Sequence, residues 1–401
     1  MRAAFLALAL TATTAFVTPA FADLTLSSEI ATTGLAATET RLAALPEPKP
    51  DELFALAGIR FLSGVEGALQ LRWQTGMRAD WSELPLLRLP IPENPAARPF
   101  AATDIVTLFD RADARMADAR AALTALGDQD FALEIRLSDL WFDINSNGTR
   151  EQGEEMAAIA GLTLAGMGRF ISDQPFDPVV RFDTADAAWL SAYTQFLSAF
   201  ATTALAFDPA PVVERVIASA AAMQALWGTT PPPNAMDMMF GRQVDRAAMI
   251  LLALAEPPDP ALALKAHGHL LAMIADNRRF WKLVEAETDN AMEWVPNDAQ
   301  VSALGLPMPP GTGKRWQAVL ADAEGMLEGR LLVPHWRMGA EAGLNLKKIF
   351  ENPPAIDIIT FVQGEGLLPY AEKGTRVTAN SWWEFADIVQ GDALLFAVFL
   401  N

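Results

Sequence analysis

Clusters of proline divide this chain into stretches of helix-forming residues, and this division constrains the fold more than any other feature of the sequence. The clusters lie at 85–99, 231–233, 257–260, 307–310 and 353–354. Proline lacks a backbone N–H and disfavours a helical residue before it, so each cluster ends a helix or holds extended chain. Between the clusters the sequence is rich in Ala, Leu, Met and Glu, which favour helices. We therefore expect a mainly α protein, built as a bundle of helical hairpins.

The clearest predicted helix covers 183–207. No charged residue occurs from Ala187 to Phe207, the apolar side chains repeat with the spacing of one helical face, and Asp183 suits the N-cap. A membrane span is the rival interpretation, but six Ser, Thr and Gln side chains make the stretch too polar. We predict a buried central helix. The full set of predicted helices covers 27–45, 50–78, 101–126, 153–170, 183–207, 210–226, 235–255, 259–287, 312–330, 355–363 and 381–399.

Two segments depart from the helical pattern. Residues 131–137 alternate between apolar and polar side chains, which is the period of a half-buried strand, and 86–92 holds prolines that favour extended chain. These segments give the fold a minor extended or β component. Residues 23–401 are predicted to form a single helical domain, with one possible seam at 229–234.

Charge and cysteine content exclude several classes of function. The chain has 30 Lys and Arg against 49 Asp and Glu, a formal net charge of −19, and this acidic surface argues against a nucleic-acid partner. Cysteine is absent, so disulfides, thiolate metal sites, cysteine nucleophiles and iron–sulfur clusters are excluded.

The first 22 residues have the pattern of a secretory signal peptide. Arg2 precedes an uncharged run from Ala3 to Val17, Pro19 breaks it, and Ala20-Phe21-Ala22 places small residues where a signal peptidase cuts. We expect cleavage between Ala22 and Asp23, no transmembrane segment in the mature chain, and a periplasmic location, with complete secretion as the alternative.

One motif carries specific chemistry. Residues 143–154 read DINSNGTREQGE and fit the D-x-[DN]-x-[DN]-G-x5-E pattern of calcium loops at every specified position. Calcium prefers six to eight oxygen ligands, and alternate residues of a tight loop can supply them around a glycine turn. These twelve residues resemble EF-hand and EF-hand-like loops. The resemblance implies a structural Ca²⁺ held by Asp143, Asn145, Asn147, Thr149, Glu151 and Glu154.

This loop departs from a paired EF-hand in two ways. Arg150 stands at position eight, which is usually aliphatic and pairs with a second loop, and no second loop of this pattern occurs in the chain. The segment before it is a predicted strand. We expect modest affinity, with a Kd of roughly 10⁻⁴–10⁻³ M, as in extracellular modules. The alternative is a polar turn that binds nothing, because Asp, Asn and Gly are also ordinary turn residues.

Other polar groupings are weaker candidates. His267 and His269 stand two apart on a predicted helix and therefore face different ways, unlike the pair of a helical zinc site. His335-Trp336-Arg337 could bind an anionic group or supply a general base, although we favour a packing cluster with Trp336 in the core. Asp183 and Asp186, with Glu66 and the other helix acids, could form the carboxylate pair of a glycoside hydrolase or lyase. Five further tryptophans are predicted core residues: Trp73, Trp141, Trp189, Trp281 and Trp316.

The sequence leaves two functional hypotheses. The first is an exported, calcium-stabilised helical protein with a binding or structural role and no assigned catalysis. The second is a secreted helical hydrolase or lyase that acts on a cell-envelope or other polysaccharide. The partner is not identified by the sequence; an envelope protein or a polysaccharide fits an exported acidic chain.

Overall fold

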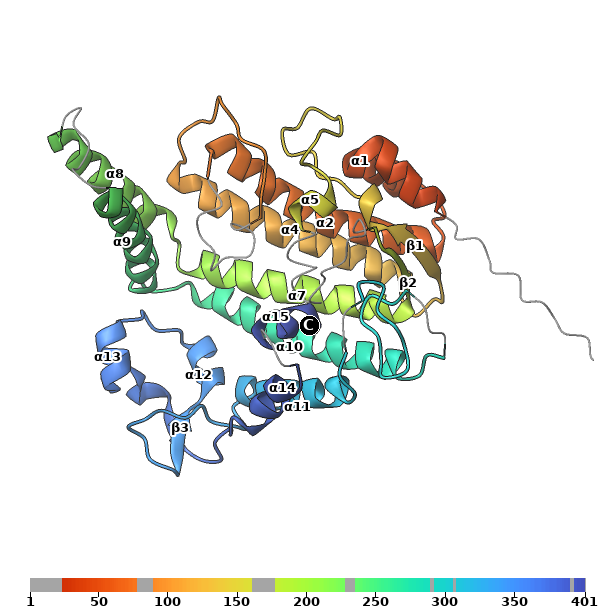
Figure 1. Cartoon of the computed structure of the whole chain (residues 1–401). Coiled ribbons are helices and arrows are strands. Elements are labelled where there is room, and N and C mark those ends of the chain that lie inside the picture. Colours follow the sequence, from red (N-terminus) through yellow and green to blue (C-terminus); the bar gives the residue numbers. More distant parts are fainter. Residues whose placement is uncertain are drawn as a thin grey trace, which may run out of the picture.

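The computed structural model describes residues 24–77, 89–160, 177–227, 235–288, 292–305, 308–389 and 393–400. It is mainly α, with two small antiparallel two-stranded sheets in the described part of the chain, and so confirms the predicted fold class (Figure 1). The helices are α1 (Thr25–Ala43), α2 (Pro50–Thr75), α4 (Ala102–Leu126), α5 (Met156–Ile159), α7 (Thr184–Ala206), α8 (Ala210–Trp227), α9 (Ala235–Leu254), α10 (Pro260–Val284), α11 (Thr312–Leu327), α12 (Leu346–Glu351), α13 (Ile358–Gln363), α14 (Asn380–Val389) and α15 (Ala393–Leu400), with 3₁₀ turns η1 (Leu137–Asp139) and η2 (Glu365–Tyr370). The strands are β1 (Ala132–Arg136), β2 (Val179–Asp183), β3 (Ala342–Leu344) and β4 (Ala371–Lys373).

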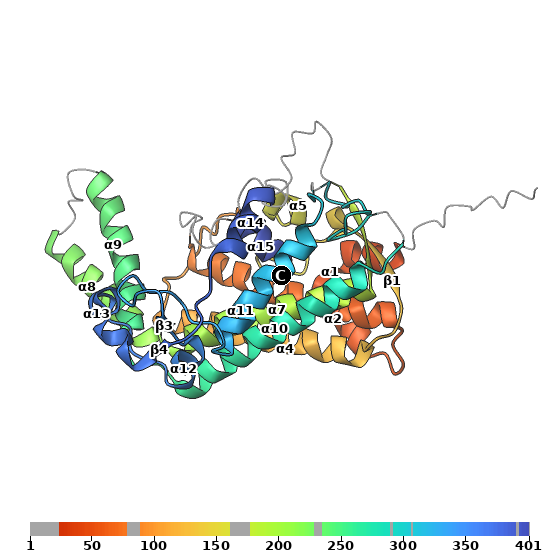
Figure 2. The ribbon, with the colours of Figure 1, turned by 90° about the horizontal axis from the view of Figure 1, so that it is seen from below.

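The centre of the molecule is the long pair α7 and α10. Helix α7 packs on α10 along one side and on α4 along the other, and α4 in turn packs on α2 (Figures 1 and 2). Ala188, Ala192, Ser198 and Thr202 of α7 are fully buried, and these small side chains let the neighbouring helices approach closely. The prediction of a buried central helix over 183–207 is therefore confirmed. No single described helix has the length and apolar character of a membrane span; α7 and α8 pass that test only as a pair bent by 64°.

Local capping signals set several helix boundaries. The side chain of Asp183 accepts a hydrogen bond from the amide of Ala185 at the start of α7, as predicted. Asp259 caps α10 in the same way and Pro260 follows it at the first helical position. Helix α2 begins with Pro50 after its cap residue. These ends lie within a few residues of the predicted ones.

The strand predicted at 131–137 is β1. It pairs with β2 in antiparallel register, with Leu133 opposite Phe182 and Ile135 opposite Val180. The extended segment predicted at 86–92 forms no strand in its described part, 89–92, and 86–88 lies outside the described residues. The described part of the helix predicted at 153–170 contains only the short helix α5. Residues 161–170 lie outside the described residues.

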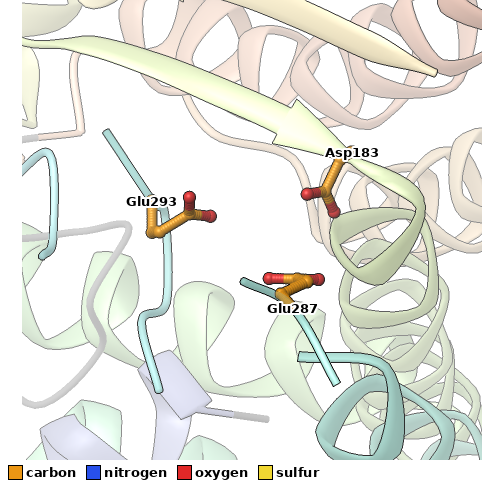
Figure 3. A group of neighbouring side chains, drawn as sticks. All are labelled: Asp183, Glu287 and Glu293. Carbon is orange, nitrogen blue, oxygen red and sulfur yellow. The ribbon is translucent and has the colours of Figure 1, made fainter. Parts of the chain in front are cut away.

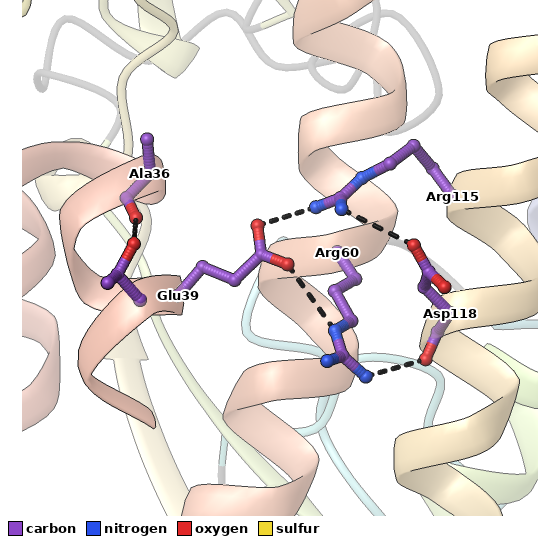
Figure 4. Close-up of polar contacts among 6 residues, drawn as sticks. Ala36, Glu39, Arg60, Arg115 and Asp118 are labelled. Carbon is purple, nitrogen blue, oxygen red and sulfur yellow. Dashed lines mark hydrogen bonds and ion pairs between the residues drawn. The ribbon is translucent and has the colours of Figure 1, made fainter. Parts of the chain in front are cut away.

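A cluster of charged side chains ties three helices together (Figure 4). Glu39 of α1 accepts from Arg115 of α4 at 2.6 Å, and its other oxygen lies 3.4 Å from Arg60 of α2. Arg60 also donates to the backbone carbonyl of Asp118, at 2.9 Å. Because these pairs are partly shielded and share partners, they fix the relative rotation of α1, α2 and α4 better than isolated surface pairs would.

The end of α15 is buried at the centre of the molecule. The predicted helix 381–399 is divided into α14 and α15, and 390–392 lies outside the described residues. Phe399 and Leu400 are buried, and their carbonyls accept hydrogen bonds from the indole of Trp189 and the amide of Asn277. The predicted core tryptophans Trp141, Trp189, Trp281 and Trp316 are buried and Trp73 is half-buried. The predicted signal segment 1–22 and the possible seam at 229–234 lie outside the described residues.

Candidate metal sites

The loop at 143–154 is closed at its base by backbone pairing. Trp141 and Glu155 form an antiparallel bridge, and the amide of Phe142 donates to the carbonyl of Glu154 at 2.9 Å. Inside the loop Ser146, Gly148 and Gly153 adopt positive φ angles, of 60°, 74° and 93°. Glycine takes such a backbone without strain, which explains Gly148 at the turn position of the motif.

The first half of the loop folds around its own side-chain oxygens. The two oxygens of Asp143 accept from the amides of Asn147 and Gly148, each at 2.9 Å. Asn145 Oδ1 also accepts from the amide of Asn147, and Asn147 Oδ1 accepts from the amide of Thr149. These repeated turns draw the side chains of the first, third and fifth loop positions toward one another.

The second half closes the ring. Glu151 accepts one hydrogen bond from each side-chain amide of Asn145 and Asn147, at 2.9 and 2.8 Å. Glu154 is only 1% exposed, and its two oxygens accept from the amides of Ile144 and Glu151. All six predicted ligand residues therefore belong to one hydrogen-bonded ring.

Helix α2 contributes an acidic residue that the motif does not contain. Glu66 accepts a hydrogen bond from the amide of Asp143 at 2.8 Å, and Gln70, one turn further on, donates to the carbonyl of Asp143. Burial, reinforced by the charges of Asp143 and Glu154, raises the pKa of Glu66 to about 7. Burial likewise raises the pKa of Glu154, with a smaller part from Asp143. Helix α2 also carries Asp51, Glu52, Arg60 and Arg72, so its sequence does not distinguish Glu66 as the residue that meets this loop.

This arrangement suits a hard cation. Its donors are carboxylate, amide and hydroxyl oxygens, with neither sulfur nor imidazole, and its net charge is negative. Arg150 donates to the carbonyl of Ser138 in η1, so the residue at the eighth loop position holds the loop against η1. A bound Ca²⁺ would draw on Asp143, Asn145, Asn147 and Glu154 as motif ligands, with Glu66 adjoining them.

A second acidic cluster lies at the start of α7 (Figure 3). Asp183 lies at the end of β2, Glu287 follows α10, and Glu293 forms a short β-bridge with Ser302. Each of the three acidic residues offers a carboxylate oxygen within 4.8 Å of the other two. Asp183 also lies 3.8 Å from Arg181. Three acidic side chains this close could hold a metal ion, although sequence reasoning did not single out Glu287 or Glu293.

Asp186, which lies beside this cluster, stabilises the start of α7. It is 4% exposed and accepts a hydrogen bond from the amide of Asp183, completing a capping box at the start of α7. Burial raises its pKa well above the usual range, and the charges of Asp183, Glu293 and Glu287 add to the rise. The predicted pair Asp183 and Asp186 is thus brought together by helix capping.

The histidines have structural partners. His267 Nε2 lies 2.8 Å from the carbonyl of Leu327, and His269 Nδ1 lies 2.5 Å from Gln195, so the two face different neighbours as predicted. The prediction that Trp336 lies in the core is wrong, because its ring is 70% exposed. Its indole N–H donates to the carbonyl of Val362 and the guanidinium of Arg337 stacks on its outer face, 4.5 Å from the ring centroid, which holds the ring on the surface.

Comparison of the chain with protein-family models, curated proteins and solved structures finds no match. Function has to be inferred from the residues themselves.

Proposed function

We propose that the protein is exported and that its loop 143–154 binds one structural Ca²⁺, which fastens the loop to α2. The observation that supports this most directly is that the Glu66 carboxylate accepts from the backbone amide of Asp143, in the loop that also holds the buried Glu154. Two of these three carboxylates are buried, and the pKa of Glu66 is raised to about 7. A cation among them would offset both the lost hydration and the mutual repulsion.

Calcium is favoured over other metals by the donor set. Zinc and other transition metals prefer sulfur or imidazole, and magnesium keeps most of its water and demands octahedral geometry. A loop of carboxylate and amide oxygens fits calcium. Because an external medium holds far more calcium than cytosol does, an exported protein needs only a Kd of roughly 10⁻⁴–10⁻³ M. The proposed role is to stabilise the fold, with an envelope protein or a polysaccharide as the partner class.

Binding of calcium to the purified chain tests this proposal. We expect titration calorimetry to show one saturable calcium site. Glu154→Gln should abolish binding. Glu66→Gln should weaken the affinity by roughly tenfold, because one favourable charge interaction with the ion is lost. Glu155→Gln is the matched control, because Glu155 lies outside the ligand set and its bond to the amide of Gly153 survives the change. Wild-type protein that shows no saturable binding at millimolar calcium contradicts the proposal.

A second candidate function is a hydrolase or lyase for polysaccharide, and the acidic cluster at the start of α7 favours it. Its carboxylate oxygens, within 4.8 Å of one another, are close to the separation of roughly 5–5.5 Å that retaining glycosidases use. We place it second because Asp183 is already engaged in capping α7. Release of reducing ends from peptidoglycan or a polyuronate, lost in Glu293→Gln and retained in Glu154→Gln, would establish it.

A further inference from the structure

An apolar cavity of about 130 Å³ lies between the N-terminal helices, the first sheet and the central helix. Its lining comes from α1, α2, β1, η1, α5, β2 and α7, with Leu140 and Trp294 from connecting segments. An enclosed cavity with an apolar lining, about 150 Å³ in an engineered example, stays dry and accepts molecules such as benzene, and the present cavity has a similar lining but is partly open. Most native cores have no void so large, because side chains fill them to crystal density.

The lining determines what the cavity can hold. Its side chains are those of Leu, Ile, Ala, Phe, Met and Trp, so none carries a charge or an oxygen. The two tryptophans supply the only polar groups, and the indole N–H of Trp189 already donates to the carbonyl of Phe399. The indole nitrogen of Trp294 is buried and has no hydrogen-bond acceptor among the described residues. A carboxylate or ammonium would therefore lose its hydration without compensation.

The space is also apparent from a glycine of α2. Gly58 lines the cavity, and a Cβ placed on it would meet no heavy atom within 4 Å. Aromatic side chains stand around the same space: the ring centroids of Phe54 and Phe182 are 5.4 Å apart, and those of Trp189 and Trp294 are 5.6 Å apart. Rings at these separations prefer edge and offset contacts, which a further flat ring could extend.

We infer that this cavity is a binding site for a small, neutral, apolar molecule of aromatic type, with at most one hydrogen-bond acceptor. This function goes beyond the proposed calcium site and does not depend on it. The acidic groups Asp183 and Glu293, which directly precede or follow lining residues in sequence, further disfavour an anionic ligand such as a fatty acid.

Fluorobenzene, followed by fluorine NMR on the purified full chain, is the probe. We expect saturable binding at one site per chain and no binding of 4-fluorobenzoate, which has the same ring with a charge. Ala55→Leu and Gly58→Leu place side-chain atoms in the cavity and should each weaken fluorobenzene binding by roughly tenfold or more. Gly67→Leu is the matched control, because Gly67 lies on the same helix, also has open space at its Cβ, and does not line the cavity.

Four outcomes would overturn the inference. Fluorobenzene binding that does not saturate shows only partition onto the surface. Equal affinity for fluorobenzene in wild type and in both cavity variants shows that the ligand binds elsewhere. Equal binding of 4-fluorobenzoate and fluorobenzene refutes the inference that the ligand is neutral. Two variants protect the test against misfolding at one position; if neither Ala55→Leu nor Gly58→Leu folds while Gly67→Leu does, the free volume that the inference requires is absent.

Discussion

The loop at 143–154 and the acidic cluster at the start of α7 both gather carboxylates, but by different means. In the loop, backbone amides of the same twelve residues bind the oxygens of Asp143 and Glu154, and only Glu66 comes from elsewhere. In the cluster, Asp183, Glu287 and Glu293 come from three separate segments. The loop is therefore a local structure that its own sequence can specify, whereas the cluster depends on the packing of α7 against α10.

Burial raises the pKa of an acidic residue in each of the two regions. Glu66 at the loop is buried beside two acidic residues, and Asp186 at the cluster is fully enclosed beside three. In both places the charged form is disfavoured mainly because it loses water. The proposed Ca²⁺ would offset the lost hydration of Glu66 and Glu154 at the loop.

The largest expected effect is a dependence of stability on pH that Glu66 causes. Its pKa rises from 4.5 in the unfolded chain to about 7 in the folded one, so the native state holds a proton that the unfolded state has lost in this window. Stability contributed by Glu66 is complete below pH 4.5 and is lost as pH rises through 7, by about 3 kcal/mol. Urea unfolding at pH 5 and pH 8, in chelator, measures it.

Glu66→Gln supplies the control for that experiment. The variant keeps an oxygen for the amide of Asp143 but cannot titrate, so the fall in stability between pH 5 and pH 8 should be smaller than in wild type. Asp186→Asn should leave the Glu66 step in place, because Asp186 lies at the start of α7 and not at the loop. Identical pH profiles for wild type and Glu66→Gln would refute the assignment.

Substitution of a buried glutamate should lower stability by a smaller amount, and by different amounts in the two regions. Glu154→Gln, measured in chelator, should lower the free energy of unfolding by about 2 kcal/mol, because one of the two backbone amides that Glu154 binds loses its acceptor. Glu293→Gln removes a like charge from beside Asp183 and Glu287 and should cost less than Glu154→Gln does. Denaturant melts of both proteins decide this; a greater loss in Glu293→Gln would reverse the comparison.

The loop turn gives a further test. Gly148 has φ of 74°, where a side chain is strained, so Gly148→Ala should cost about 1 to 2 kcal/mol. Gly67→Ala in α2 has an ordinary helical backbone with open space at its Cβ, and should instead gain up to about 1 kcal/mol. Thermal melts in chelator compare the two; equal shifts would show that the turn is not held in this conformation.

The elements that could be predicted from the sequence are those that local contacts specify, as in the loop. The starts of α7 and α10 depend on Asp183, Asp259 and Pro260, whose effects act within one helical turn, and β1 shows its period in five residues. Short elements such as β3 and α12 were not predicted, because too few residues carry a period.

Distant contacts explain what sequence reasoning missed at the candidate sites. Glu66 lies 77 residues from Asp143, and nothing in its helix indicates which loop it meets. Glu287 and Glu293 approach Asp183 only because α10 packs along α7. The exposure of Trp336 depends on Val362, 26 residues away, and the apolar cavity depends on seven elements at once.

The most direct test of the calcium proposal is a thermal melt of residues 23–401 in calcium and in chelator at matched ionic strength. With calcium at ten times Kd, binding to the folded state adds about 1.4 kcal/mol, so wild type should melt at a higher temperature in calcium. Comparing the two melts within each variant removes any change in intrinsic stability. The increment should vanish in Glu154→Gln and persist in Glu155→Gln. Equal melting temperatures for wild type in calcium and in chelator would contradict the proposal and leave 143–154 as an ordinary polar turn.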